Sequence, residues 1–375
     1  MFKIIYPKFD ATVYSRYPEK NTGMDQILEL GKQASGEPVV DGDNTVYYDK
    51  TYNSRIFLKF DLSTVSSSIV AGKIDPNTAK YYLNLTATEA SALPIEYDVY
   101  AYPLSGSWKN GTGYYNNDPE VTNGVSWYYR SGKGVSDRWP TGSYGANVSG
   151  SYGLVNGGGN WYTYSFASQS FFKESPDLRM DITPIVRTWL SGSIVNNGIV
   201  VKFPDTIEQD TSVIGNIQFF SVESHTIYLP KLEIYWDSRD YSGTSSYSQV
   251  SGDDFILHGK NLKAFYNTNE TANIRFFVRE RYPNLTYATS SYVTHAKRLP
   301  VSTWFQIQDV VSDTVVVPID PTGSFVNCDA LGNYIKIDCQ SLMPERKYKI
   351  ILKGEFDSGD TVRYIDENLV FGIRR

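Results

Sequence analysis

The stretch from residue 181 to residue 203 is the part of the chain whose local structure the sequence determines most narrowly. Thr183 can cap a helix, and Pro184 suits its first turn, where a missing N–H costs nothing. The apolar residues of the next two turns share one face, and Trp189 is the largest of them. Gly192 follows the last apolar residue and can adopt the left-handed conformation that ends a helix. We therefore expect one short amphipathic helix.

A buried strand is expected directly after this helix. The turn signal Asn196-Asn197-Gly198 leads into the apolar run 199–201. Almost everything else in the first 236 residues is typical of strand and loop, and the strongest strand pattern is the alternating segment 54–63. The helix would then close one edge or end of a β-sandwich, with Trp189 as its anchor.

Composition agrees with a mostly β fold. The chain has 375 residues, which favours two domains, and 30 tyrosines and 29 glycines. The net charge is −6, and acidic and basic residues are interspersed along the chain. This pattern argues against a basic groove for nucleic acid and against a polybasic membrane-binding surface.

A change of composition predicts where the two domains meet. Residues 237–252 are rich in Ser, Gly and Tyr, as linkers are. We assign residues 1–236 to the first domain and residues 253–375 to the second. The second domain shows eight short strand-like runs separated by turn signals, which favours an immunoglobulin-like β-sandwich.

The two cysteines and the first residues bear on the cellular compartment. Cys328 and Cys339 lie in segments that look like neighbouring strands of a hairpin, so a disulfide is geometrically allowed, although buried free thiols are favoured. The first eight residues lack the apolar region and cleavage site of a secretory signal. No segment is long and apolar enough to span a membrane. We therefore expect assembly in the cytoplasm.

Residues 105–165 form a long aromatic insert with weak periodicity. Four of the seven tryptophans fall in it, and a loop of this length inside a compact domain is usually functional. Three interpretations stay open: the rings pack within the loop, they anchor a protein–protein interface, or they stack on sugar rings. The candidate interface or sugar-binding residues are Trp108, Tyr114, Tyr115, Trp127, Tyr128, Tyr129, Trp139 and Trp161.

The sequence shows no pattern that is typical of catalysis. The histidines His225, His258 and His295 are scattered without metal-ligand spacing, and Asp253-Asp254 is an adjacent pair in a linker. A phosphate-binding loop is followed by a helix, and no helix pattern follows Gly157-Gly158-Gly159. No nucleophile elbow is present. We predict a protein that is not an enzyme, with no catalytic residue, no cofactor and no metal site.

Several motifs of the first domain, in this order, resemble a DNRLRE-type domain. They are Asp10-Ala11-Thr12-Val13, the strand 54–63, segments 108–113 and 124–127, Asp181-Ile182-Thr183, Trp189 with Asn197-Gly198, segment 219–223 and Pro230-Lys231-Leu232. The resemblance covers roughly residues 10–236. It implies a jelly-roll sandwich related in shape to carbohydrate-binding modules and found in surface and secreted proteins. This chain departs from that setting because it has no export signal and no attached glycosidase.

The second domain is similar to β-sandwich segments of tailed-bacteriophage virion proteins. The matching stretches are 276–281, 304–308, Val317-Pro318, Gly332-Asn333-Tyr334 and 342–348. Together the two resemblances imply a structural protein of the tail or neck of the virion, a ring component as in crAss-like phages, assembled in the host cytoplasm. Its implied partners are other virion proteins of the tail, neck or fibres, and further copies of itself in a cyclic homo-oligomer. The alternative is a carbohydrate-binding adhesin whose ligand is a host glycan.

Overall fold

The computed structural model confirms a mostly β protein. It describes residues 1–34, 39–41, 44–46, 51–140, 148–150, 157–242, 247–252, 255–282 and 296–375. Among the described residues 46% lie in strands and 9% in helices. Two compact units can be separated. The aromatic unit comprises Ile5–Val70 and Tyr81–Glu233, and the C-terminal unit comprises Met1–Ile4, Ala71–Lys80 and Ile234–Arg375.

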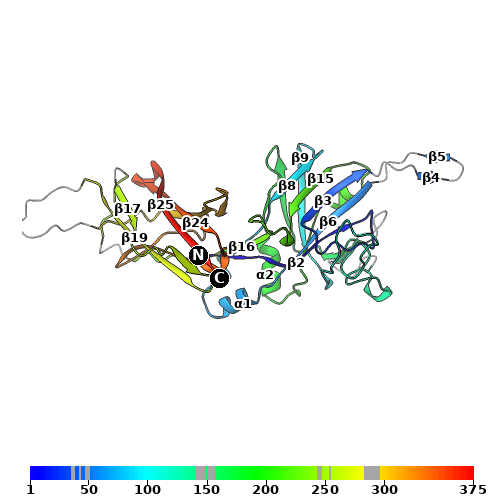
Figure 1. Cartoon of the computed structure of the whole chain (residues 1–375), viewed down its shortest axis with the longest axis horizontal. Coiled ribbons are helices and arrows are strands. Elements are labelled where there is room, and N and C mark those ends of the chain that lie inside the picture. The colour runs from blue at the N-terminus through cyan, green and yellow to red at the C-terminus, as the bar shows by residue number, and fades with distance from the viewer. Residues whose placement is uncertain are drawn as a thin grey trace, which may run out of the picture. The chain divides into compact units, whose positions relative to one another are not determined.

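The main sheet of the aromatic unit has β6 near its centre (Figure 1). Its strand order is β12-β9-β14-β6-β3-β15-β8, and β2 pairs with β6 beside β3. All of these pairs are antiparallel. The strands are β2 (Pro7–Tyr14), β3 (Ile27–Ala34), β6 (Thr51–Phe60), β8 (Ala87–Ser91), β9 (Glu96–Pro103), β12 (Ala167–Phe172), β14 (Ile199–Lys202) and β15 (Gly215–Phe220).

A second, four-stranded sheet has the order β1-β16-β7-β13. Its strands are β1 (Phe2–Ile5), β7 (Lys80–Leu85), β13 (Leu178–Asp181) and β16 (Lys231–Tyr235). In β7 the alternation predicted for a strand with one buried face is complete, because Tyr81, Leu83 and Leu85 are buried and their neighbours are half-buried. The chain passes from one unit to the other within β1, β7 and β16. Two small hairpins, β4 (Val39–Asp41) with β5 (Asn44–Val46) and β10 (Val148–Gly150) with β11 (Asn160–Tyr162), complete the strands before residue 236.

The predicted helix exists as α2 (Thr183–Leu190), and its cap differs from the prediction. Ile182 is the N-cap residue and Thr183 is the first helical residue. The Thr183 hydroxyl accepts a hydrogen bond from the Tyr81 backbone N–H (3.0 Å), so it joins the helix to β7 and does not cap it. Gly192 has φ of +74° and ends the helix as expected. Trp189 is only 7% exposed.

The expectation of a single helix was wrong. Among the described residues there are also α1 (Ser63–Val70) and the one-turn helix α3 (Asp205–Glu208). Helix α1 is rich in serine, and only Val65 is buried in it, so it has little of the apolar periodicity that identifies a helix in a sequence. The Asp61 carboxylate accepts a hydrogen bond from the Ser63 N–H (2.9 Å) at its start.

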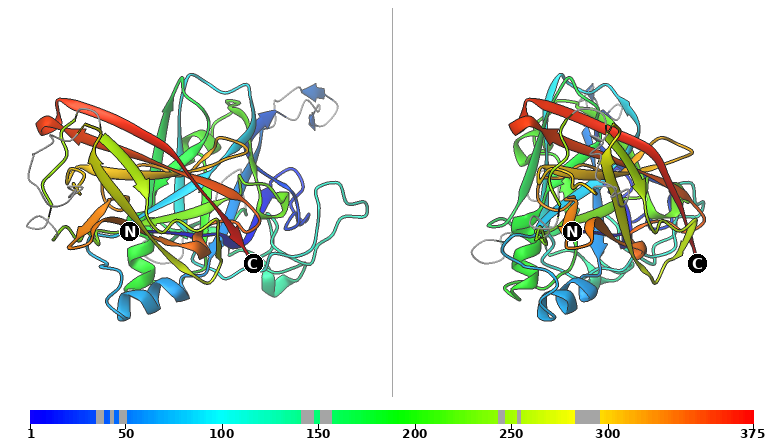
Figure 2. Two further views of the ribbon diagram at one scale, coloured as in Figure 1. Left: turned by 60° about the vertical axis from the view of Figure 1, so that its left-hand side comes forward. Right: turned by 90° about the vertical axis from the view of Figure 1, so that its left-hand side faces the viewer.

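The C-terminal unit holds the two sheets of a β-sandwich. One has the order β17-β19-β23-β22 and the other β18-β25-β24-β20-β21, in which the long strands β24 and β25 pair along most of their length (Figure 2). The Phe255 ring in β17 lies 5.5 Å from the Phe356 ring in β24, which joins the two sheets. The strands are β17 (Phe255–Gly259), β18 (Phe265–Asn267), β19 (Thr271–Glu280), β20 (Thr303–Asp309), β21 (Val315–Val317), β22 (Asn327–Asp329), β23 (Gly332–Asp338), β24 (Lys347–Phe356) and β25 (Thr361–Arg374).

Two details of this unit concern the predicted linker and the cysteines. The Asp240 carbonyl accepts a hydrogen bond from the Cys328 N–H (2.9 Å), and Ser242 N–H donates to the Cys328 carbonyl (2.8 Å). The described part of residues 237–252 is therefore bound to the edge of the unit at β22. Cys328 and Cys339 are both free and buried, which confirms the favoured alternative. In the β22–β23 hairpin Cys328 pairs with Asn333, not with Cys339.

Replacing Trp189 by alanine tests its role as an anchor. Because the indole is buried, Trp189→Ala should reduce the free energy of unfolding by about 3–5 kcal/mol. Val195→Ala is the matched control, since Val195 is 72% exposed, and should change it by less than about 0.5 kcal/mol. Urea denaturation of the two variants and the parent measures both values. A Trp189→Ala midpoint equal to that of the parent would show that the indole contributes nothing to the fold.

Candidate functional site

The aromatic insert forms a second layer over the main sheet. The four tryptophans Trp108, Trp127, Trp139 and Trp161 are between 1% and 4% exposed. They belong to one apolar cluster with Phe57 and with residues of β2 and β14. The Phe57 ring lies 5.8 Å from the Trp108 ring and 5.7 Å from the Trp139 ring. Packing within the loop is therefore the interpretation that fits these four residues, and none of them presents an indole face to a ligand.

This layer explains why β6 is buried on both faces. Ile56, Leu58 and Phe60 share one face, as the sequence predicts, and each is at most 1% exposed. Phe57 and Arg55 lie on the other face, which a half-buried strand would leave in water, and they too are at most 1% exposed. The insert covers that face.

A buried ionic cluster joins the insert to the sheet. The Arg55 guanidinium lies between two indoles, 4.8 Å from the Trp127 ring and 5.0 Å from the Trp161 ring. It donates to the Glu208 carboxylate through Nε (2.9 Å) and Nη2 (2.5 Å). Lys202 Nζ lies 3.0 Å from the same carboxylate. Burial of these charges is tolerated because each is paired and hydrogen-bonded.

The glycine run 157–159 lets the chain pass over this cluster. All three glycines have positive φ, between +72° and +108°. A Cβ atom on Gly158 would lie 2.6 Å from Arg55 Nη1, and one on Gly157 would lie 2.5 Å from the Trp127 ring. The Gly158 carbonyl accepts a hydrogen bond from Arg55 Nη1 (2.7 Å). The run thus serves close packing, and no phosphate-binding helix follows it.

Asn21 holds the first half of the insert in place. Its Nδ2 donates to the carbonyls of Asn110 (2.7 Å) and Val125 (2.8 Å), and its Oδ1 accepts from the Gly113 N–H (2.8 Å). Asn21 itself is fully buried. One amide side chain therefore fixes both ends of segment 110–125 against β2 and the turn that follows it.

The predicted tyrosines occupy different surroundings. Tyr129 is buried, and its hydroxyl donates to Glu19 (3.3 Å). Tyr128 is half-buried beneath the Arg138 guanidinium. Tyr114 and Tyr115 are 46% and 38% exposed. Of the eight candidate interface or sugar-binding residues, these last two offer the most ring surface to a partner.

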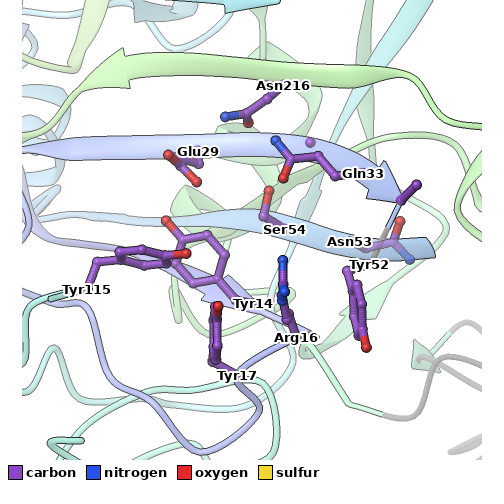
Figure 3. A pocket seen from close by; sticks show the side chains of 12 residues that line it. Tyr14, Arg16, Tyr17, Glu29, Gln33, Tyr52, Asn53, Ser54, Tyr115 and Asn216 are labelled. Atoms are coloured by element: carbon purple, nitrogen blue, oxygen red, sulfur yellow. The ribbon is translucent and has the colours of Figure 1, made fainter. Parts of the chain in front are cut away.

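Tyr115 lines a polar and aromatic pocket on the aromatic unit (Figure 3). Tyr14, Tyr17 and Arg16 come from the end of β2 and the turn after it, and Tyr52 comes from β6. Opposite them lie Glu29 and Gln33 of β3, with Asn216 of β15 beyond (Figure 3). Sequence analysis missed all of these residues except Tyr115, because they come together only through the pairing of β2, β3, β6 and β15.

Ring and charge contacts define the geometry of this pocket. Arg16 Cζ lies 5.7 Å from the Tyr17 ring and 5.6 Å from the Tyr52 ring. The Tyr115 ring lies 5.1 Å from the Tyr14 ring and 5.7 Å from the Tyr17 ring. Lys20 Nζ donates a hydrogen bond to the Tyr115 carbonyl (3.0 Å), and burial raises the pKa of Tyr115 to about 12. The Tyr115 hydroxyl is therefore a neutral hydrogen-bonding group at physiological pH.

Two carboxyl groups near the pocket, the buried Asp10 and the half-buried Asp25, have raised pKa values. Burial raises the pKa of Asp10 from its ordinary 3.8 to about 7, although its Oδ2 accepts the Val222 N–H (2.8 Å), which acts in the opposite direction. Burial raises the pKa of Asp25 to about 6, while two hydrogen bonds from the Tyr115 N–H (3.0 Å each) lower it. Both groups bind protons more tightly in the folded chain than in the unfolded chain.

A separate group of aromatic side chains lies where β9 meets β12. Tyr100 and Tyr102 of β9 have ring centroids 6.0 Å apart and nearly parallel planes. Phe166 lies 5.8 Å from Tyr100 and 5.7 Å from Tyr102 and is 46% exposed. Tyr164, two residues before Phe166, has its ring centroid 5.7 Å from that of Tyr162 and is 49% exposed. We call these four residues the β9–β12 patch. Strand β12 is the last strand at this edge of the main sheet.

His225 and His258 are exposed and lie in different units, and His295 and the Asp253-Asp254 pair lie outside the described residues. Within the described ranges no three His, Cys, Asp or Glu side chains are grouped so that they could hold a metal ion. None of the helices in the same ranges has the length and apolar character needed to cross a membrane.

Comparison with known proteins gives no relative: no family model matches this chain, and no curated protein matches it. The resemblance to DNRLRE-type domains and to phage virion proteins therefore depends on the quoted motifs.

Removing the charge of Glu208 tests the buried ionic cluster. Glu208→Gln leaves the Arg55 and Lys202 cations buried without their shared anion, and should lower the free energy of unfolding by about 3–5 kcal/mol. The exposed Glu174 gives the control Glu174→Gln, expected within about 0.5 kcal/mol of the parent. Urea denaturation distinguishes these values. Equal effects of the two substitutions would contradict the structural role of the cluster.

The pKa of Asp10 predicts a pH dependence. A carboxyl group that titrates near pH 7 when folded and near 3.8 when unfolded makes the fold less stable as pH rises between those values. From about pH 5 to about pH 7 its contribution should fall by about 2 kcal/mol, and Asp25 adds in the same direction below about pH 6. Asp10→Asn should therefore flatten the dependence. Asp61→Asn, which removes an exposed charge at the start of α1 but keeps an amide oxygen as acceptor, should leave the slope between about pH 5 and about pH 7 unchanged, because the pKa of Asp61 is lowered.

Proposed function

We propose that this chain is a non-enzymatic structural protein of a tailed-phage virion, which assembles in the host cytoplasm into a cyclic ring in the tail or neck. Its partners would be further copies of itself and neighbouring tail, neck or fibre proteins. The proposal starts from the two resemblances of the sequence. The β9–β12 patch is the structural observation that favours it most.

The patch has the chemistry of a protein–protein contact. Aromatic rings bury a large area at a small cost in side-chain entropy and are enriched at the centres of interfaces. Phe166 and Tyr164 expose nearly half of their surface beside the terminal strand β12. The sequence of β12, Ala167-Ser-Gln-Ser-Phe-Phe172, contains no charged residue or proline. The Gln169 side chain of β12 bonds to the backbone of Asp177 and Arg179, so the contact surface would be the exposed rings and not the backbone of β12. A contact between this surface and a different surface of the next copy would generate a ring.

The architecture favours a scaffold for contacts over a catalyst. The tryptophans of the insert are buried in its packing against the main sheet, and the buried charges around Arg55 are paired with one another. Such an insert is a rigid support. The recognising surfaces would be the partly exposed tyrosines and phenylalanines at its margins.

Imaging of the particles tests the proposal. We expect copies of the chain in a closed ring, with the β9–β12 patch at the subunit contact. Absence of the chain from particles, or its presence as isolated copies, would contradict the ring.

A double variant tests the patch itself. Tyr164→Ser combined with Phe166→Ser should reduce incorporation into particles at least about tenfold, because interface aromatics often contribute more than about 2 kcal/mol. Tyr364→Ser is the matched control, since Tyr364 of β25 is 66% exposed and belongs to the C-terminal unit, outside the patch. Loss of incorporation with the control and not with the double variant would move the contact away from the patch.

A further inference from the structure

The pocket around Arg16 has two chemically different sides. On one side Arg16 lies against Tyr17 and Tyr52, so that a planar cation is flanked by two aromatic rings. On the other side stand Glu29 and Gln33 (Figure 3). Aromatic faces favour apolar C–H surfaces, whereas a guanidinium and a carboxylate favour hydroxyl groups as acceptors and donors. A polyhydroxylated ring is the kind of molecule that offers both.

The charges of the lining favour a neutral ligand. Arg16 carries one positive charge and Glu29 one negative charge, and the remaining polar side chains that line the pocket are uncharged. Glu29 Oε1 accepts a hydrogen bond from Gln218 Nε2 (2.9 Å), which fixes the carboxylate in place. Since the two opposite charges largely cancel, an anion would gain little from entering the pocket, while each charged group can still hydrogen-bond a hydroxyl.

The floor of the pocket depends on a glycine. A Cβ atom on Gly31 would lie 2.7 Å from Asn216 Oδ1, so only glycine lets the Asn216 amide lie against β3 at this point. The cavity has a volume of about 50 Å³. Pockets that enclose a drug-sized ligand have volumes of roughly 300–1,000 Å³. This pocket can therefore receive one edge of a single sugar ring, with the rest of the molecule outside.

We propose that the pocket formed by Arg16, Tyr17, Tyr52, Glu29 and Tyr115 binds the terminal residue of a neutral saccharide. One face of the sugar lies against the tyrosine rings, and its hydroxyls bond to Arg16 and Glu29. This site is separate from the tryptophans of the insert, and it does not depend on the assembly proposed above.

Binding is tested with the full chain and methyl glycosides of D-glucose, D-galactose and D-mannose, with D-glucuronate as the charged probe. Saturation-transfer difference NMR detects binding, and NMR titration gives the dissociation constant. Because only one ring edge is held, we expect a dissociation constant on the order of millimolar for at least one neutral glycoside. Arg16→Ala should weaken it about tenfold or more, the effect of losing a hydrogen bond to a charged group.

Further variants separate binding from folding. Tyr52→Leu should weaken binding, whereas Tyr52→Phe, which keeps the ring, should retain it. Tyr364→Ala, at an exposed position of β25 that does not line the pocket, should bind like the parent. Each variant is compared with the parent by thermal unfolding, so that a loss caused by misfolding is recognised; if Tyr52→Leu is unfolded, the exposed Arg16→Ala variant decides. Absence of binding to all neutral glycosides, binding of D-glucuronate alone, or full binding by Arg16→Ala would each overturn the proposal.

Discussion

The aromatic unit depends on how the charge of Arg55 is accommodated. Its guanidinium is buried between Trp127 and Trp161 and paired with Glu208. A buried cation without a partner would cost several kcal/mol, so the strand that carries Arg55, the insert that carries the two tryptophans and helix α3 that carries Glu208 are stable only together. One side chain thereby joins three segments that are remote in the sequence. The insert, a loop by composition, becomes part of the folded core.

This constraint decides which aromatic residues are available for recognition. An indole that covers Arg55 or packs on Phe57 cannot also contact a ligand. The exposed rings are instead found at two margins of the aromatic unit, the β9–β12 patch and the pocket beside Tyr115. Each includes residues on strands of the main sheet, Tyr100 and Tyr102 of β9 in the patch and Tyr14 and Tyr52 of β2 and β6 in the pocket. Rings held on a rigid support lose little conformational entropy when they bind, which is what a repeated contact in an assembly or a weak contact with a sugar requires.

The sequence predicted what depends on local pattern. The strand at 54–63, the strand at 199–201 and the helix that ends at Gly192 all appear in the structure, as β6, β14 and α2. Predictions from the sequence were wrong where tertiary contacts determine the local structure. Thr183 has the right hydroxyl for a cap, but the hydroxyl bonds to β7. Strand β3 was missed because Lys32, in the middle of its alternation, is polar; the structure buries it, and its Nζ donates to the carbonyls of Ile207 and Asp210. The pocket could not be predicted from the sequence, because its residues come from several separate segments.

The tryptophans show most clearly why composition alone could not identify the site. A Gly-rich, Ser-rich and Trp-rich segment has the same composition whether its rings face solvent or a sheet. The difference lies in partners outside the segment. Asn21 binds the backbone of residues 110, 113 and 125, and the Phe57 ring contacts the rings of Trp108 and Trp139. The glycines then have a specific purpose, since the positive φ at Gly157 and Gly158 brings the backbone close enough for the Gly158 carbonyl to accept a hydrogen bond from Arg55. A segment whose glycines and tryptophans pack around Arg55 and Phe57 is a core layer, and Tyr114 and Tyr115 are the two candidate residues that it leaves most exposed.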